Sequence, residues 1–254
     1  MAAINNLHVE FGCPLDLSAM PVLHKTLRGI KLSHGTAKKA RYPITSSVLH
    51  RIHSKLQPFQ SSDVDSSMLW AAFTLAFFGF LRSSEFTCNG NFDPHSHLAR
   101  SDISFHPNIL HPISFDIVIK KSKTDPFRET AKLTIARSYS DVCAVTALQD
   151  YMLQTATRDP GQPLFIFSCG LNLTRTSLTN NLRTLLNLCN IDSSCYASHS
   201  FRIGAATTAG AAGIPDWLIK TLGRWKSNAY QVYIRTPKKT LCKVPQSLAS
   251  SSSC

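Results

Sequence analysis

The spacing of apolar residues divides the chain into segments with helical periodicity and segments with strand periodicity. Apolar positions recur every three or four residues before residue 40, after residue 45 and again beyond residue 140. Between Ser101 and Arg137 they alternate with polar positions, in D-I-S-F, I-S-F-D-I-V-I-K and A-K-L-T-I-A-R, which is typical of strands. The pattern predicts a mainly helical α+β protein with one small antiparallel sheet.

The first forty residues hold two short helical patterns that are interrupted by Pro14 and Pro21. They contain too few apolar residues for a core of their own. The stretch S-H-G-T-A-K-K-A-R-Y-P follows, which is small, basic and typical of a linker. We therefore expect a small appendage at residues 1–40 and one large domain at residues 41–254, with a mobile tail.

The segment D-V-D-S-S-M-L-W-A-A-F-T-L-A-F-F-G-F-L-R carries helix-capping residues at its start and is then apolar on nearly all sides. Such a helix is predicted to lie at the centre of the domain, with Arg82 at its end. Helical patterns return in V-C-A-V-T-A-L-Q-D-Y-M-L, S-L-T-N-N-L-R-T-L-L-N-L-C and H-S-F-R-I-G-A-A-T-T-A-G-A-A-G. Pro215 is expected to open one further helix.

The charge balance indicates a polyanionic partner. The formal net charge is +12 and the isoelectric point is near 9.5, and nucleic acid is the leading candidate. Eight basic residues fall in a window without Asp or Glu, and they include Lys31, Lys38, Lys39 and Arg41, while Lys121 lies in the predicted hairpin. The window is interpreted either as a surface that contacts phosphates or as a solvated, flexible linker.

The eight cysteines form no C-x-x-C pair, so neither a zinc site nor a disulfide framework is predicted. No signal-peptide pattern is present, and the longest apolar run, residues 68–81, is too short to cross a bilayer. We expect a soluble protein of the nucleus or the cytoplasm, with no membrane partner and no bound metal or other cofactor.

Five short motifs follow one another in an order that resembles the tyrosine recombinases, also called the phage-integrase-like family. Arg82 ends the buried helix in G-F-L-R-S-S-E-F, Lys123 lies in S-K-T, and His199 and Arg202 form H-x-x-R. The dipeptide L-G and then Tyr233 complete the set. Each motif alone has an ordinary structural interpretation, but together they cover residues 41–240. The resemblance implies the family's catalytic-domain fold.

The residue types suit metal-independent cleavage of a phosphodiester. Arg82 and Arg202 can each present paired N–H donors to the phosphate oxygens, which stabilises the charge of the transition state. The resemblance implies that Tyr233 attacks phosphorus and forms a 3′-phosphotyrosine, while Lys123 protonates the leaving 5′ oxygen. His199 is expected to act as a base or to orient the phosphate.

Two assignments stay open, and one acidic residue is added to the site. The position that holds His or Trp in the family contains Arg224, with Trp225 next to it, and either can donate a hydrogen bond to the phosphate. Tyr230 is a rival nucleophile three residues earlier, but the Tyr-Ile-Arg context and the distance in sequence from Arg202 favour Tyr233. Glu85 is the acidic residue that is expected to orient Arg82 or His199.

The predicted function is a site-specific DNA recombinase or integrase that acts on double-stranded DNA, as a tetramer when active. Residues 1–40 resemble only the last part of the family's helical DNA-clamping domain, which suggests a truncated copy. The main alternative to an active recombinase is therefore an inactive protein, descended from a mobile element, that still binds DNA. A topoisomerase of type IB is a third interpretation. The wording of the motifs is closest to recombinase-like proteins of eukaryotic mobile elements of the DIRS type.

Overall fold

The chain consists of two compact units, residues 1–40 and residues 41–254, and each is described by itself. A computed structural model describes residues 2–13, 16, 19–34, 41–56, 63–120, 130–234 and 245. The first unit contains α1 (Ala2–Glu10) and α2 (Pro21–His34). Its apolar side chains are largely exposed, with Phe11 at 77%. The described part of this unit therefore lacks a buried core.

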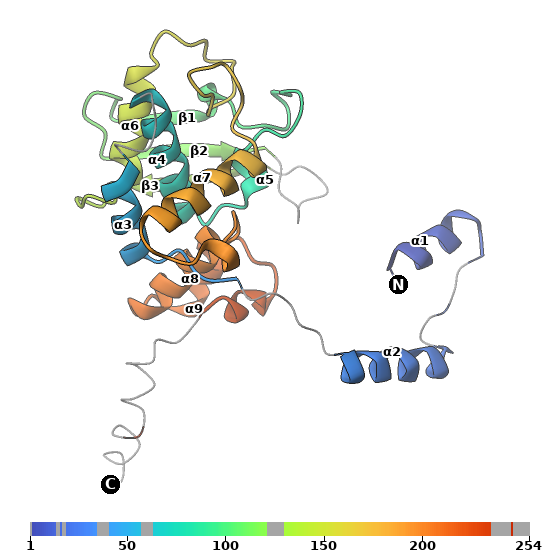
Figure 1. The fold of residues 1–254 in the computed structure, drawn as a ribbon. Helices are drawn as coiled ribbons and strands as arrows, with labels where there is room; N and C mark the ends of the chain where they lie inside the picture. The colour runs from blue at the N-terminus through green and yellow to red at the C-terminus, as the bar shows by residue number, and fades with distance from the viewer. Residues whose placement is uncertain are drawn as a thin grey trace. The chain divides into compact units, whose positions relative to one another are not determined.

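The second unit is built around α4 (Asp63–Phe78), which is buried along most of its length. It packs against α3 (Ser46–Leu56), α6 (Ala144–Gln154) and α8 (Ser200–Ala211). Because its neighbours cover several sides, α4 needs apolar residues all round, and the prediction of a central helix is confirmed. Figure 1 shows the sheet toward one end of this unit and α8 and α9 toward the other.

The three predicted strands form one antiparallel sheet in the order β1-β2-β3. Their bounds are β1 (Ile103–His106), β2 (Ser114–Ile119) and β3 (Ala131–Ala136). Ile117 of the central strand lies opposite Ile103 and Leu133. Because Phe115, Ile117 and Ile119 alternate along β2, all three point into the core, where they are buried. The loop between β2 and β3, residues 121–129, lies outside the described residues.

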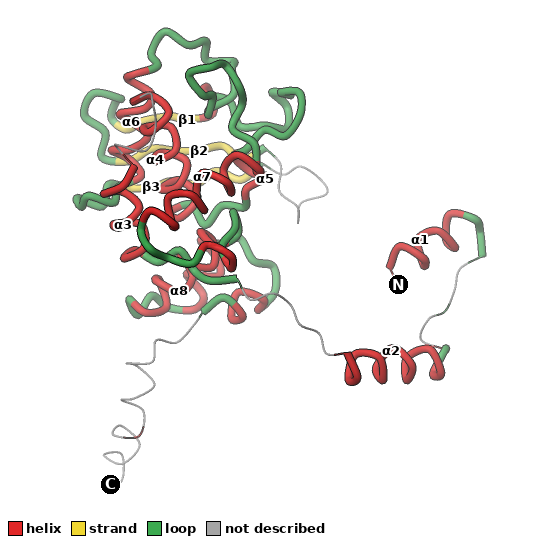
Figure 2. The backbone as a smooth tube through the Cα atoms, viewed as in Figure 1, coloured by secondary structure: helices red, strands yellow, loops and turns green. Residues whose placement is uncertain are grey.

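The remaining elements are helical, as Figure 2 shows. They are α5 (Ser83–Phe86), α7 (Arg175–Leu188), α9 (Asp216–Leu222) and the short 3₁₀ helices η2 (Arg100–Asp102), η3 (Ser193–Cys195) and η4 (Asn228–Val232). Pro215 directly precedes α9, where its fixed φ suits the start of a helix. The helix predicted after Pro215 is confirmed. The elements α5 and η4 were not predicted, because four or five residues are too few to show a helical period.

One glycine of α8 sets how closely this helix approaches the chain that enters α3. A Cβ at Gly204 would lie 1.7 Å from the carbonyl oxygen of Ile44. The Ile44 amide also donates to the carbonyl of Ser200 at 2.9 Å. The contact is therefore backbone against backbone, and only a residue without a side chain fits.

Among the described residues, no helix is both long and apolar enough to cross a membrane. Within the same residues, no three His, Cys, Asp or Glu side chains lie close enough together to hold a metal ion.

Candidate active site

Arg82 is held in place by the carboxylate of Glu85. It follows the central helix and caps α5, with extended backbone angles of φ −80° and ψ 146°. Its main-chain N–H donates to Glu85 Oε2 at 2.9 Å, and its Nη1 donates to Oε1 at 3.0 Å. The Arg82 side chain is 17% exposed, whereas that of Glu85 is fully buried. The pair thus orients Arg82 while its guanidinium still reaches the surface.

The same carboxylate also binds Arg224, one of the two candidates for the family's His or Trp position. Arg224 Nη2 donates to Glu85 Oε2 at 2.8 Å, and Nη1 donates to the carbonyl of Gly79 at 3.2 Å. The backbone of Arg224 is left-handed, with φ +54°, which turns its side chain back toward the central helix. Arg224 therefore supports the arginine cluster through Glu85 and Gly79.

Trp225, the other candidate, lies on the guanidinium of Arg202. The Cζ atom of Arg202 is 4.2 Å from the centroid of the indole ring, a cation–π contact. Arg202 Nη1 donates to the carbonyl of Phe80, and Nη2 donates to the carbonyl of Gly223. Arg202 is 0% exposed. Its charge contributes to the field of the site, but its donors face carbonyl groups and its surface is covered.

The imidazole of His199 is neutral at pH 7. Burial, and then the positive charges of Arg202, Arg82 and Arg175, lower the pKa of His199 to about 4. Burial and the neighbouring Arg82 also lower the pKa of Arg202 to about 9, so that this guanidinium keeps its proton at neutral pH. The site thus combines a neutral imidazole with several cations, which is the electrostatic setting that an anion requires.

Tyr233 lies beside this imidazole. The ring centroids of Tyr233 and His199 are 5.3 Å apart in an edge-on arrangement, and the Tyr233 ring is 5.8 Å from that of Trp225. Its carbonyl accepts a hydrogen bond from Thr207 Oγ1 of α8 at 2.8 Å. Thr207 is two turns beyond His199 on the same side of α8, so this bond ties the tyrosine segment to the helix that carries H-x-x-R.

The rival Tyr230 points elsewhere. It is buried, with 5% exposure, and its hydroxyl lies 3.4 Å from Asp216 Oδ2 at the start of α9. Its ring packs against Trp225 at a centroid distance of 6.0 Å. The phenol of Tyr230 therefore already has a partner in the fold, whereas the half-buried Tyr233 lies next to the imidazole.

Two further residues contribute to the site, and the role of Arg175 was not identified from the sequence. Arg175, the first residue of α7, is exposed and adds to the positive field at His199. Ser198 Oγ donates to Ser83 Oγ at 3.2 Å, which links the start of α8 to α5. Arg175 belongs to no motif and lies 24 residues in sequence from His199, so only the fold brings its charge to the site. Ser198 directly precedes His199, but its partner Ser83 is 115 residues away, and that contact depends on the fold.

Several predicted residues are not placed at this cluster. The candidate proton donor Lys123 and the predicted DNA contacts Lys38, Lys39 and Lys121 lie outside the described residues. Lys31 belongs to α2 in the first unit. Arg41 is the first residue of the second unit and is half-buried. The structure brings together the remaining candidates, namely Arg82, Glu85, His199, Arg202, Arg224, Trp225 and Tyr233.

Comparison with known proteins gives no match to a family model and no match to a curated protein. Solved structures do match. The XerH site-specific recombinase, in a post-cleavage complex with a palindromic difH substrate, has a TM-score of 0.61 and 14% identity over 83% of this chain and 53% of its own. XerA recombinase has a TM-score of 0.59 and 16% identity, over 83% of this chain and 64% of its own.

A lambda integrase dimer bound to a COC′ core site is also similar, with a TM-score of 0.54 and 14% identity over 92% of this chain. The chain spans about half to two thirds of the length of these proteins, 53% of the XerH chain and 63% of the integrase. At such identities the likeness concerns the fold. The mainly helical second unit with its three-stranded antiparallel sheet therefore has the tyrosine recombinase catalytic-domain fold that the order of the motifs predicted.

Proposed function

We propose that this chain is a site-specific DNA recombinase or integrase whose nucleophile is Tyr233. The observation that carries the proposal is the position of Tyr233. Its ring centroid lies 5.3 Å from that of the neutral His199 imidazole, whose pKa is lowered by burial and by the nearby arginines. In a fold shared with recombinases bound to DNA, that arrangement suits attack of a phenol on a phosphodiester.

The reaction is a transesterification in two steps. The Tyr233 oxygen attacks phosphorus while its proton passes to a base, for which His199 Nδ1 or Nε2 is the candidate. The bond from phosphorus to the 5′ oxygen breaks, and that oxygen leaves as a hydroxyl after it takes a proton. Lys123 remains the candidate donor on the strength of its S-K-T motif. A 5′ hydroxyl then reverses the sequence and rejoins the strand.

The arginine cluster supplies the charge that this chemistry needs. Positive groups close to the reacting phosphate stabilise the extra negative charge of its pentacoordinate transition state. Burial, and then the charges of the neighbouring arginines, lower the pKa of His199 to about 4, and a bound phosphate would neutralise the second of these causes. Binding of DNA is thus expected to raise the basicity of His199 at the moment when a base is required.

The test uses a nicked suicide DNA substrate, on which cleavage traps the protein as a covalent adduct. The wild-type protein is expected to form an adduct that is absent in Tyr233→Phe. Tyr230→Phe is the matched control, because it removes the same atom from a phenol that contacts Asp216. An adduct that persists in Tyr233→Phe and is lost in Tyr230→Phe would overturn the assignment of the nucleophile.

One observation favours a second candidate, a DNA-binding protein that does not cleave. Arg202 is fully buried, and its two terminal nitrogens donate to main-chain carbonyls while Trp225 covers its face. A chain fixed in this arrangement lacks one of the two phosphate clamps. Salt-dependent binding of duplex DNA, with no adduct under any condition, would support this candidate over the recombinase.

The finer parts of the proposal follow from the motifs. We place double-stranded DNA as the partner, with Lys31, Lys38, Lys39, Arg41 and Lys121 as additional phosphate contacts. Assembly into a tetramer, cleavage without a metal, and an origin in a DIRS-type mobile element belong to the same proposal. Sedimentation with and without DNA tests the assembly, and cleavage in the presence of EDTA tests the independence from metals.

A further inference from the structure

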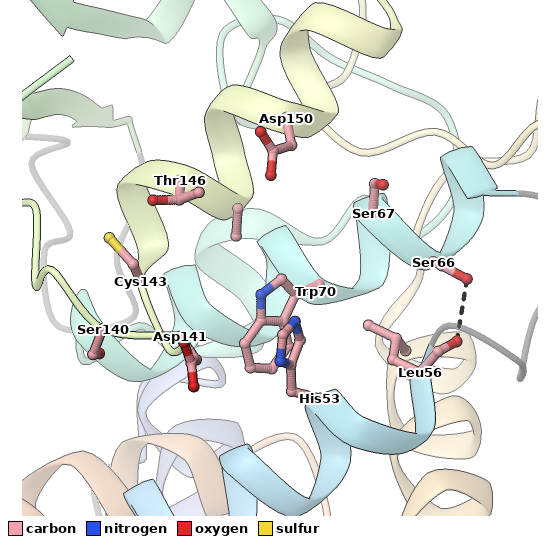
Figure 3. Close-up of a pocket in the computed structure, with 11 residues that line it drawn as sticks. His53, Leu56, Ser66, Ser67, Trp70, Ser140, Asp141, Cys143, Thr146 and Asp150 are labelled. Atoms are coloured by element: carbon pink, nitrogen blue, oxygen red, sulfur yellow. Dashed lines mark hydrogen bonds between the residues drawn. The ribbon is translucent and has the colours of Figure 1, made fainter. Parts of the chain in front are cut away.

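A pocket lies where α3, α4 and α6 meet, away from the arginine cluster (Figure 3). Its volume is about 340 Å³, within the range of small-molecule sites. Trp70 lines it and precedes Phe78, the last residue of α4, by eight residues, hence by about 12 Å along the helix axis. Arg82 lies farther along the chain beyond Phe78. The pocket is therefore separate from the site proposed for DNA cleavage.

An aromatic wall with an unused donor forms one side of this pocket. The rings of His53 and Trp70 are stacked, with centroids 4.5 Å apart and planes 26° apart. Trp70 is 8% exposed, and its indole N–H donates to no other residue that the structure describes. Figure 3 shows the indole nitrogen on the edge of the ring that faces α6, where Thr146 and Asp150 lie. Although the ring is buried, its nitrogen is open to the solvent of the pocket, where it is available to donate to a bound acceptor.

Two carboxylates define the charge of the pocket. Asp141 precedes α6 and Asp150 lies on it; both are exposed, and within the described ranges neither makes an ion pair or a hydrogen bond. Burial lowers the pKa of His53, so this imidazole is neutral at pH 7. Burial raises the pKa of Asp150, and the positive charge of Arg137 acts in the opposite direction. The described lining contains no lysine and no arginine.

The acidic character of this pocket differs from the basic character of the chain as a whole. The protein carries 27 Lys and Arg against 15 Asp and Glu. A pocket with two carboxylates and no cation among its lining residues repels the phosphates that the arginine cluster attracts. It attracts a cation instead, through the exposed carboxylates of Asp141 and Asp150 at its rim.

We propose that this pocket binds an organic cation, a guanidinium or ammonium group on a chain that also carries a carbonyl. The cation lies against Asp141 and Asp150, and the carbonyl accepts the hydrogen bond that the indole of Trp70 offers. Basic amino-acid derivatives and basic residues of a polypeptide share this chemistry. The site is independent of the proposed recombination, because none of its residues belongs to the arginine and tyrosine cluster.

The test is a titration of the full chain with Nα-acetyl-arginine methylamide, followed through the indole N–H signals in an ¹H–¹⁵N spectrum. Trp70→Phe identifies the signal of Trp70 and removes the donor while it keeps an aromatic ring. The expected result is a saturable shift of that signal. Asp150→Asn and Asp141→Asn are each expected to weaken binding by up to about fivefold, since each removes an ion pair made by an exposed carboxylate.

Two matched controls make the outcome decisive. The citrulline analogue of the probe has the same shape without the charge, and Asp159→Asn removes a carboxylate that lies outside the pocket. The proposal is overturned by an absent or non-saturable shift, by an equal shift with the citrulline compound, or by unchanged affinity in both pocket variants. A pentapeptide with a central arginine separates the sources: tighter binding than the amide indicates a polypeptide, and equal binding indicates a small ligand.

Discussion

Trp225 keeps the guanidinium of Arg202 away from solvent, and its removal is expected to expose that group. The indole covers the guanidinium at 4.2 Å, and the two terminal nitrogens donate to the carbonyls of Phe80 and Gly223. A phosphate reaches Arg202 only when this arrangement opens. Because Trp225 lies on the same segment as Tyr233, opening would move the cover and the proposed nucleophile together.

The magnitude follows from the contact that is lost. A cation–π contact away from water contributes about 2 kcal/mol. If Trp225→Ala removes that amount from the closed arrangement, the population with an accessible Arg202 increases about thirtyfold. Trp225→Phe keeps an aromatic face and is expected to give a smaller increase. This variant is therefore the matched control for the loss of the ring.

The assay is chemical modification of arginine by phenylglyoxal, followed by mass spectrometry of peptides. Arg175 is exposed and serves as the internal reference in each sample. Arg202 is expected to react far more slowly than Arg175 in the wild type, and about thirtyfold faster in Trp225→Ala than in the wild type. The measurement needs neither DNA nor activity, so it reports on the cover alone.

A second substitution, at Gly223, tests the same packing of the Trp225 ring on Arg202. A Cβ at Gly223 would lie 1.7 Å from a ring atom of Trp225, while the backbone φ of −81° accepts an alanine. Gly223→Ala is therefore expected to displace the indole and to raise the labelling of Arg202, with Trp225 itself retained. Rapid labelling of Arg202 in the wild type, or unchanged labelling in both variants, would refute the reasoning.

Three further predictions concern stability. Because the pKa of His199 is about 4 in the folded protein and 6.5 when unperturbed, the unfolded chain binds this proton first as the pH falls. Unfolding free energies measured by urea are expected to fall by up to about 3 kcal/mol between pH 6.5 and 4, and this slope should shrink in His199→Gln. Glu85→Gln removes the countercharge of both Arg82 and Arg224 and is expected to cost about 3 kcal/mol or more in the same assay, whereas an unchanged stability would contradict the shared pairing. Gly204→Ala places a Cβ 1.7 Å from a main-chain oxygen, so a cost of about 3 kcal/mol and a lower Tm are expected, and an unchanged Tm would exclude the close approach.

The fold was predicted from the sequence wherever an element is long enough to show its period. The all-apolar pattern of residues 63–78 indicated the central helix, because only a helix covered on several sides tolerates it. Alternation in I-S-F-D-I-V-I-K indicated the central strand. The four residues of α5 and the five of η4 are too short to show a period. Tertiary contacts hold these segments, such as those of Glu85 with Arg224 and of Thr207 with the Tyr233 carbonyl.

At the site, the sequence by itself determined which residue types are available and in what order: Arg82, His199, Arg202 and Tyr233 stand in recognisable motifs. Motif spacing cannot give the direction of a side chain. The left-handed backbone of Arg224 and the carboxylate of Glu85, 139 residues earlier, decided that pairing.

Tertiary structure likewise put Trp225 on Arg202 and the Tyr230 hydroxyl beside Asp216. The reason is physical: local patterns encode the elements, whereas the partner of a charged or aromatic group depends on which distant segments the packed core brings within a few ångströms.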